Sequence, residues 1–385
     1  MGSGLTSVFV SAIDASADLH AAEWVKELRR LRPGVRVCGA GGVAMEKAGV
    51  EIVLPQRELA VAGVVEVLGI LPQVISAWRR LERAVREARP GLAVLLDAPD
   101  FHLPLAKRLK RQGLPLLYYI GPNVLRWRRG RIHTLARRAD RLASIFPFEP
   151  DLYRDTSLRV DYVGHPLVEP LRDFARQWDR RTAREALSLD PAAPVVALAP
   201  GSRHNELRHM LRPFALAAAS MRRRNPRLRF ALCVAPTLSR EQIVAALPEP
   251  PEALGIQLVE GRTREVLVAA DAALVKPGSI TMEAALLGCP LVVAGRAHPL
   301  TAALLRRVVK EPSFAMPNVI AGEPIVPEFL QQDARPEALA DAVLALVDGP
   351  AGRGQREALA KVRERLGDGA AARHTAAIAN EMLAG

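Results

Sequence analysis

Short apolar runs alternate with longer segments of helical periodicity through the first half of the chain. A run such as Leu92–Leu96, which contains no polar residue, is typical of a strand covered on both faces of a sheet. Between the runs, Ala21–Leu31 places Trp24, Val25 and Leu28 on one helical face. The alternation predicts a doubly wound parallel α/β sheet. Its strands are expected at Ser7–Ala12, Val35–Cys38, Leu92–Leu96, Leu116–Ile120, Leu142–Phe146 and Val160–Val163.

A second series of the same kind follows the polar region Arg172–Arg184. Its strands are expected at Val195–Ala199, Phe230–Ala235, Gln257–Val259, Ala272–Val275 and Leu291–Ala294. The pattern predicts two Rossmann-like doubly wound domains facing a central cleft, with boundaries at residues 1–170 and 185–335. The remaining residues, 336–385, have helical periodicity and are expected to pack across the domains.

Two carboxylates follow directly after the most apolar strand. Asp97 and Asp100 lie at the expected carboxyl edge of the first sheet, and helical character is expected to resume near Pro104. A carboxylate held there beside apolar walls can act as a general base, with Asp97 as the first candidate and Asp100 as the second. The alternative, that either residue only ties down the turn through backbone N–H groups, stays open at this point.

The second half contains two junctions suited to phosphate. In the first, Gly201 allows close backbone approach, Ser202 offers a hydroxyl, and Arg203 can clamp a diphosphate before a helix that begins near Glu206. A plain turn with a helix cap explains this junction about as well.

The second junction is Lys276–Glu283, in which Gly278 and Ser279 open a helix and Glu283 can accept hydrogen bonds from a ribose diol. The alternative role for Glu283 is to complement the helix dipole. Together the two junctions favour a nucleotide diphosphate site. Neither is a Walker loop or a GxGxxG fingerprint, which disfavours ATPase and dehydrogenase functions.

The charge of the chain restricts its partners. There are 53 Lys and Arg against 41 Asp and Glu, a formal net charge of +12, which attracts polyanions. Aromatic residues make up 4% of the chain and no nucleic-acid-binding motif is present, so nucleic acid is not expected as a partner. Cys38, Cys233 and Cys289 are widely spaced and are expected to be buried thiols, not metal ligands. No apolar stretch is long enough to span a bilayer.

Several motifs, in one order along the chain, resemble the lipid-A-disaccharide synthases, a family of glycosyltransferases of the GT-B type. They are Leu59–Leu68, Asp97–Phe101, Phe146–Glu149, Val163–Pro166, Pro200–Arg203 with Glu206, and Met316–Gly322. The resemblance implies transfer of an acylated glucosamine from UDP to an acylated glucosamine 1-phosphate, giving lipid A disaccharide 1-phosphate and UDP. We expect an inverting transfer that uses neither a metal nor a cofactor. Arg203 and Asn318 are expected to stabilise the leaving UDP.

The resemblance also implies a peripheral protein on the cytoplasmic face of the inner membrane. The segment Leu59–Leu71, apolar apart from Glu66, is suited to acyl chains or to the membrane surface, and arginines follow it. An ordinary buried helix is the alternative. A homodimer is one candidate for the oligomeric state.

The departures from the family pattern concern the acceptor side. The family usually has Gly-Glu-Ala-Ser-Gly-Asp where this chain has Ile13–Asp18, so both glycines are missing. Asp14, Ser16 and Asp18 keep polar side chains there, and together with Glu66 they are candidate contacts of the acceptor. An aromatic loop becomes Pro122–Trp127, which retains Asn123 and Trp127 as candidate acceptor contacts. A divergent paralogue with another acceptor therefore stays open, as do a UDP-N-acetylglucosamine epimerase and a catalytically inactive UDP- or lipid-binding protein.

Overall fold

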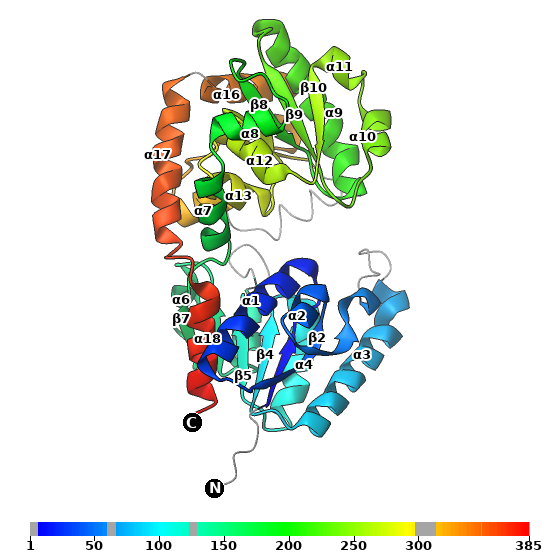
Figure 1. Cartoon of the computed structure of the whole chain (residues 1–385), viewed down its shortest axis with the longest axis vertical. Coiled ribbons are helices and arrows are strands. Elements are labelled where there is room, and N and C mark those ends of the chain that lie inside the picture. The colour runs from blue at the N-terminus through cyan, green and yellow to red at the C-terminus, as the bar shows by residue number, and fades with distance from the viewer. Residues whose placement is uncertain (1–6, 60–66, 123–128, 297–312, 348, 385) are drawn as a thin grey trace. The chain divides into compact units, whose positions relative to one another are not determined.

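The chain folds into two compact units. The computed structural model describes residues 7–59, 67–122, 129–296, 313–347 and 349–384 (Figure 1). Unit 1 comprises Met1–Pro166 with Leu366–Gly385, and unit 2 comprises Leu167–Arg365. The C-terminal helices are shared between the units. Helices α16 (Pro336–Val347) and α17 (Pro350–Arg365) belong to unit 2, and α18 (Ala371–Met382) belongs to unit 1.

Unit 1 is built on a seven-stranded parallel sheet in the order β3-β2-β1-β4-β5-β6-β7. The strands are β1 (Ser7–Ser11), β2 (Arg36–Gly41), β3 (Glu51–Pro55), β4 (Leu92–Leu96), β5 (Leu116–Tyr119), β6 (Arg141–Ser144) and β7 (Arg159–Tyr162). The central strand β1 pairs with β2 on one side and with β4 on the other. The order of strands therefore reverses between β1 and β4, and the loops after these two strands diverge.

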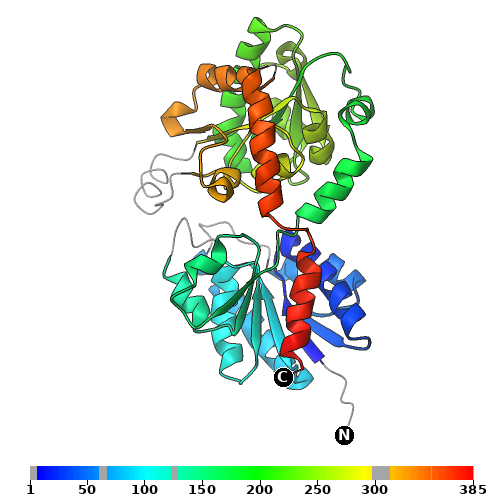
Figure 2. The ribbon, with the colours of Figure 1, turned by 90° about the vertical axis from the view of Figure 1, so that its left-hand side faces the viewer.

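Helices cover both faces of this sheet because its strand side chains alternate between two apolar layers. Val8 and Val10 of β1 pack in one layer with α1 and α18, whereas Phe9 packs in the other with α3 and α4. Figure 2 shows α18, in red, lying against this unit. The helices are α1 (Ala15–Leu31), α2 (Val43–Lys47), α3 (Val67–Ala88), α4 (Pro99–Lys110), α5 (Arg131–Ala136) and α6 (Glu149–Leu152), besides α18.

Unit 2 repeats the design with a six-stranded parallel sheet in the order β10-β9-β8-β11-β12-β13. Its strands are β8 (Val195–Ala199), β9 (Arg229–Val234), β10 (Ile256–Glu260), β11 (Ala272–Val275), β12 (Leu291–Gly295) and β13 (Glu328–Leu330). Helices α9 (His204–Arg224) and α16 share one apolar layer, and α12 (Thr263–Ala269), α13 (Ile280–Leu286) and α17 contribute to the other. Here the order reverses between β8 and β11.

Besides α16 and α17, the described part of unit 2 contains further α-helices. They are α7 (Val168–Gln177), α8 (Arg180–Ala186), α9 (His204–Arg224), α10 (Arg240–Ala246), α11 (Pro251–Leu254), α12 (Thr263–Ala269), α13 (Ile280–Leu286) and α15 (Met316–Ala321). The polar region Arg172–Arg184 is largely helical, in α7 and α8. Most of its charged side chains lie at exposed positions of these two helices.

Each expected strand is present, with ends shifted by a few residues, so the prediction of two doubly wound sheets is confirmed. Strands β3 and β13 are missing from the expected set, and both lie at sheet edges. Their apolar runs are only Ile52–Leu54 and Phe329–Leu330, which are shorter than the run expected of a buried strand. The three cysteines are free and buried, as expected.

The expected start of the helix after Asp97 is wrong. Helix α4 begins at Pro99, and Pro104 lies inside it. Pro99 suits the first helical position, where a missing N–H group has no partner to lose. Asp100 consequently belongs to the first turn of α4 and not to the loop that follows β4.

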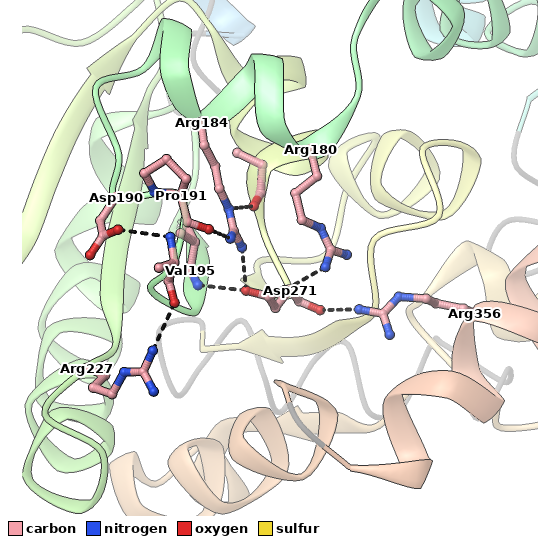
Figure 3. Close-up of polar contacts among 10 residues, drawn as sticks. Arg180, Arg184, Asp190, Pro191, Val195, Arg227, Asp271 and Arg356 are labelled. Atoms are coloured by element: carbon pink, nitrogen blue, oxygen red, sulfur yellow. Dashed lines mark hydrogen bonds and ion pairs between the residues drawn. The ribbon is translucent and has the colours of Figure 1, made fainter.

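A buried ion network fixes the amino-terminal edge of the unit 2 sheet (Figure 3). The Asp271 carboxylate accepts hydrogen bonds from the Val195 amide at 2.8 Å, from Arg184 at 2.7 Å and from Arg180 at 2.9 Å. The backbone oxygen of Asp271 accepts another from Arg356 of α17 at 2.9 Å. One aspartate therefore joins two helices to the starts of β8 and β11.

We expect Asp271→Ala to lower the free energy of unfolding by about 3–5 kcal/mol, because Arg184, whose side chain is 8% exposed, would keep a buried charge without its carboxylate. Urea denaturation followed by circular dichroism measures the change. Asp341→Ala is the matched control, since its ion pair with Arg224 is exposed and should be worth less than about 1 kcal/mol. Equal, small losses in both variants would contradict the importance of the network.

Candidate active site

Both sheets place chemically useful side chains at the carboxyl ends of the strands where the strand order reverses. In unit 1 these are the loops after β1 and β4, which contain Asp14 and Asp97. In unit 2 they are the loops after β8 and β11, which contain Ser202 and Lys276. Open α/β sheets bind ligands at this position because the two diverging loops leave a crevice there.

The backbone at Asp97 has an unusual conformation that its neighbours hold in place. Asp97 and Ala98 have φ angles of 48° and 42°, in the left-handed region that side chains other than glycine seldom adopt. The backbone oxygen of Asp97 accepts hydrogen bonds from the Tyr118 hydroxyl at 2.5 Å and from His102 Nδ1 at 2.8 Å. These bonds fix the turn, and with it the direction of the Asp97 side chain.

The protonation of His102 follows from its partners. A carbonyl oxygen can only accept, so Nδ1 carries the proton and Nε2 accepts a hydrogen bond from the Ser11 hydroxyl at 2.8 Å. Burial lowers the pKa of His102 to about 4, which keeps the ring neutral near pH 7. His102 thus supports the turn without adding charge. The sequence interpretation missed this residue, because no motif singles it out.

The Asp97 carboxyl is poised to accept a proton. Burial raises its pKa to about 6, with a further contribution from the Asp14 carboxylate and a smaller opposing one from a hydrogen bond with the Ala98 backbone. At neutral pH the group is ionised, yet it is more basic than an ordinary aspartate. The nearby Asp14 caps α1, accepting hydrogen bonds from the Ala17 amide at 2.9 Å and from the Ser16 hydroxyl at 2.8 Å.

The other acceptor-side candidates differ in their surroundings. The Asp18 carboxylate is buried and accepts hydrogen bonds from the amides of Gly42, Ala44 and Met45, so it stabilises the start of α2. Asp100 is exposed and ion-paired with Arg131 of α5, which makes it a weaker candidate for the base than Asp97. Three further candidates lie outside the described residues, namely Glu66, Asn123 and Trp127.

Unit 2 contains a hollow of about 470 Å³ at the carboxyl ends of β8, β9 and β11. It is lined by six of the candidate residues for UDP-sugar binding, which are Gly201, Ser202, Glu206, Gly278, Ser279 and Glu283. The hollow also contains polar residues that the sequence interpretation did not select, Thr263, Arg264, Glu265 and Lys276. Lys276 stands within a motif already noted, whereas nothing in the sequence around α12 points to Arg264.

Glu206 is the centre of the hydrogen bonding at the first junction. Its Oε2 accepts a hydrogen bond from the Ser202 amide at 3.0 Å, and its Oε1 accepts one from Lys276 Nζ at 2.6 Å. Burial by itself would raise the pKa of this carboxyl, but the bonds from Lys276 and Ser202 lower it below its usual range. A Cβ atom at Gly201, where φ is 139°, would lie 2.7 Å from Glu206, so only glycine fits.

The Ser202 amide therefore bonds to Glu206 in this structure, and the Ser202 hydroxyl stays the predicted contact with phosphate. Arg203 is exposed, forms no ion pair with any described residue and is not part of the lining of the hollow, although its charge helps to lower the pKa of Glu206. Glu283 contacts Arg264, with 3.5 Å between Oε2 and Nε. Burial raises the pKa of Glu283, and Arg264 partly opposes that change.

Asn318 lies outside the lining of the hollow and its amide is fully used within the chain. Its Nδ2 donates to the Val326 oxygen at 2.9 Å and to Glu328 Oε1 at 2.8 Å, and its Oδ1 accepts from the Val326 amide at 2.7 Å. These bonds join α15 to the segment that precedes β13. The structure thus gives Asn318 a supporting role, and a contact with UDP stays a prediction.

Two general properties of the chain concern metals and membranes. Within the described ranges, no cluster of three or more His, Cys, Asp or Glu side chains is arranged to hold a metal ion. Among the described residues that line the hollow, Lys276 and Arg264 carry the positive charge. None of the described helices combines the length and apolar character needed to cross a bilayer.

Comparisons with known proteins identify both the fold and the family. The structure is similar to UDP-GlcNAc 2-epimerase from Neisseria meningitidis bound to UDP-GlcNAc, with a TM-score of 0.66, 12% identity, and coverage of 98% of this chain and 99% of that one. It is also similar to CalG4, the calicheamicin glycosyltransferase, with a TM-score of 0.64, 16% identity and 98% coverage of each chain. These likenesses confirm the GT-B fold.

The sequence comparisons go further. The lipid-A-disaccharide synthase of Anaeromyxobacter dehalogenans strain 2CP-C is 42% identical over 94% of this chain and 93% of its own. The family model described as "Lipid-A-disaccharide synthetase" matches residues 8–381. The resemblance inferred from the motifs is therefore confirmed, and the chain belongs to the lipid-A-disaccharide synthase family, whose glycosyltransferase activity serves lipid A biosynthesis.

Proposed function

We propose that the chain joins UDP-2,3-diacylglucosamine to 2,3-diacylglucosamine 1-phosphate, with Asp97 as the general base and the unit 2 hollow as the site of the UDP group. The observation that carries the proposal is the Asp97 carboxyl itself. It follows the buried strand β4 in a hydrogen-bonded left-handed turn, and its pKa is raised to about 6. Asp97 thus combines the position and the basicity that the chemistry requires.

In the proposed reaction the Asp97 carboxylate accepts the proton of the acceptor hydroxyl. The acceptor oxygen then attacks C1 of the donor sugar from the face opposite the diphosphate. As the new C1–O bond forms, the bond between C1 and the diphosphate oxygen breaks, and UDP leaves with the electron pair. Attack from the opposite face inverts the configuration and gives a β-linked disaccharide.

The departing diphosphate carries negative charge that the protein must offset. Arg203, exposed at the N-terminus of the 21-residue helix α9, and Arg264 in the hollow are placed to stabilise it. Glu283, half-buried in the same hollow, is the candidate for binding the ribose diol. Cationic side chains of this kind perform the role that a metal ion performs in other transferases.

Both proposed substrates carry acyl chains and phosphate, which suits a protein with a formal charge of +12. We therefore place the chain on the cytoplasmic face of the inner membrane as a peripheral protein. The exposed Arg79 and Arg83 of α3 would meet lipid headgroups there. Most of the preceding apolar segment, Leu59–Leu71, lies outside the described residues or has no described side chains.

The direct test is to incubate the purified chain with both diacylated substrates and to analyse the products by mass spectrometry. We expect one disaccharide 1-phosphate and one UDP for each donor consumed. Release of UDP without disaccharide, or consumption of a non-acylated UDP-sugar alone, would point to the rival functions instead.

Asp97→Asn should lower kcat by about 10²–10⁴-fold, because the amide keeps the shape of the side chain but cannot accept the proton. UDP affinity, measured by calorimetry, should stay within about twofold of the native value, since the hollow belongs to unit 2. Asp100→Asn is the matched control and should retain most of the rate. If Asp100→Asn is the variant that fails, the two carboxylates have been assigned in the wrong order.

The pH profile of kcat/KM should fall about tenfold per pH unit below about pH 6, because Asp97 is protonated there and cannot act as a base. Asp14→Asn should move this limb to lower pH. The Asp14 carboxylate raises the pKa of Asp97, so its removal lowers that pKa, while asparagine still caps α1. An unchanged limb in Asp14→Asn would show that another group titrates.

A further inference from the structure

Lys276 occupies the point in unit 2 where the two phosphate-suited junctions meet. It follows β11 directly, and its amide donates to the Ala199 oxygen at the end of β8 at 3.0 Å. The backbone of Lys276 is therefore held between the two strands at which the sheet order reverses. Its side chain lines the hollow and is 28% exposed.

The ammonium group of Lys276 is held by Glu206 on one side only. Nζ lies 2.6 Å from Glu206 Oε1, and a Cβ built on Gly278 would lie 3.9 Å from Nζ. The ammonium thus lies between Glu206 and the glycine of the second junction. Glu206 is in turn anchored by the Ser202 amide, so the lysine has a fixed partner.

An ammonium group has three N–H donors, and the bond to Glu206 uses one of them. Within the part of the chain that the structure describes, Glu206 is the ion-pair partner of Lys276 and no further hydrogen bond of its side chain is present. Two donors consequently remain for the hollow. Phosphate oxygens are strong acceptors for such a group, and lysine binds phosphate as a compact point charge.

We propose that Lys276 is a phosphate-binding residue of this hollow, which contacts the diphosphate of the nucleotide while Glu206 holds the ammonium in place. The proposal rests on the proposed function, in which the hollow takes a nucleoside diphosphate. It assigns a binding charge in the lining of the hollow to the residue that follows β11, in addition to Arg203 at the start of α9. Glu206 then has a positioning role and makes no contact with the phosphate itself.

The test is calorimetric titration of UDP, uridine and inorganic pyrophosphate into the native chain and Lys276→Met. Loss of a charged hydrogen bond should weaken UDP binding about 10- to 100-fold and weaken pyrophosphate binding similarly, with uridine unchanged. Lys361→Met removes the same charge from an exposed position on α17 and should bind all three ligands as the native chain does.

A second variant separates phosphate binding from simple neutralisation of Glu206. In Lys276→Met alone, the unpaired Glu206 carboxylate could repel phosphate, so the double variant Lys276→Met/Glu206→Gln removes both charges. Glutamine can still accept the Ser202 hydrogen bond, which preserves the loop. If Lys276 binds phosphate, the double variant remains weak.

Four results would count against these proposals in different ways. Native UDP affinity in Lys276→Met, or its recovery in the double variant, would overturn the role of Lys276. An equal loss for uridine and UDP would show a general disturbance of the hollow and would likewise overturn it. A native chain that binds no UDP would instead overturn the proposed function.

Discussion

The parallel pairing of one central strand with a neighbour on each side is the constraint from which the rest of this structure follows. In unit 1, β1 lies between β2 and β4, and in unit 2, β8 lies between β9 and β11. Because all the paired strands are parallel, their carboxyl ends share one edge, and the chain leaves the two central strands in opposite directions. Asp97 and Lys276 both occupy that position, one in each unit.

The fold gives its carboxylates very different tasks by changing their surroundings. Asp18 accepts hydrogen bonds from three backbone amides, whereas Asp271 accepts them from one amide and two arginines, and both carboxylates hold secondary structure together. Glu206 is paired with a lysine and an amide, which lowers its pKa. Asp97 is largely buried, has a second carboxylate nearby and forms no ion pair with a described cation, so its pKa rises. The same chemical group is therefore a structural tie, a positioning group or a candidate base according to its neighbours.

Much of the fold was predictable because buried parallel strands have a continuous apolar pattern. The runs at Leu92–Leu96 and Val195–Ala199 are fully buried central strands, and the polar residues after them reach the expected sheet edge. The edge strands β3 and β13 escaped prediction, since their apolar runs, Ile52–Leu54 and Phe329–Leu330, are too short to stand out from the surrounding sequence. The start of α4 was also missed, because Pro99 is compatible with a first helical turn as well as with a loop.

By itself the sequence determined the two sheets, the family and the residue types at the strand ends, because local periodicity and short motifs record these directly. Only the tertiary structure decided how those residues are used. The packing of distant segments places Asp14 near Asp97 and pairs Lys276 with Glu206. It also uses the Asn318 amide in hydrogen bonds with Val326 and Glu328. The charge around each side chain, its burial and its hydrogen-bond partners depend on residues that are far away in the chain. The periodicity of the sequence does not show which residues these are.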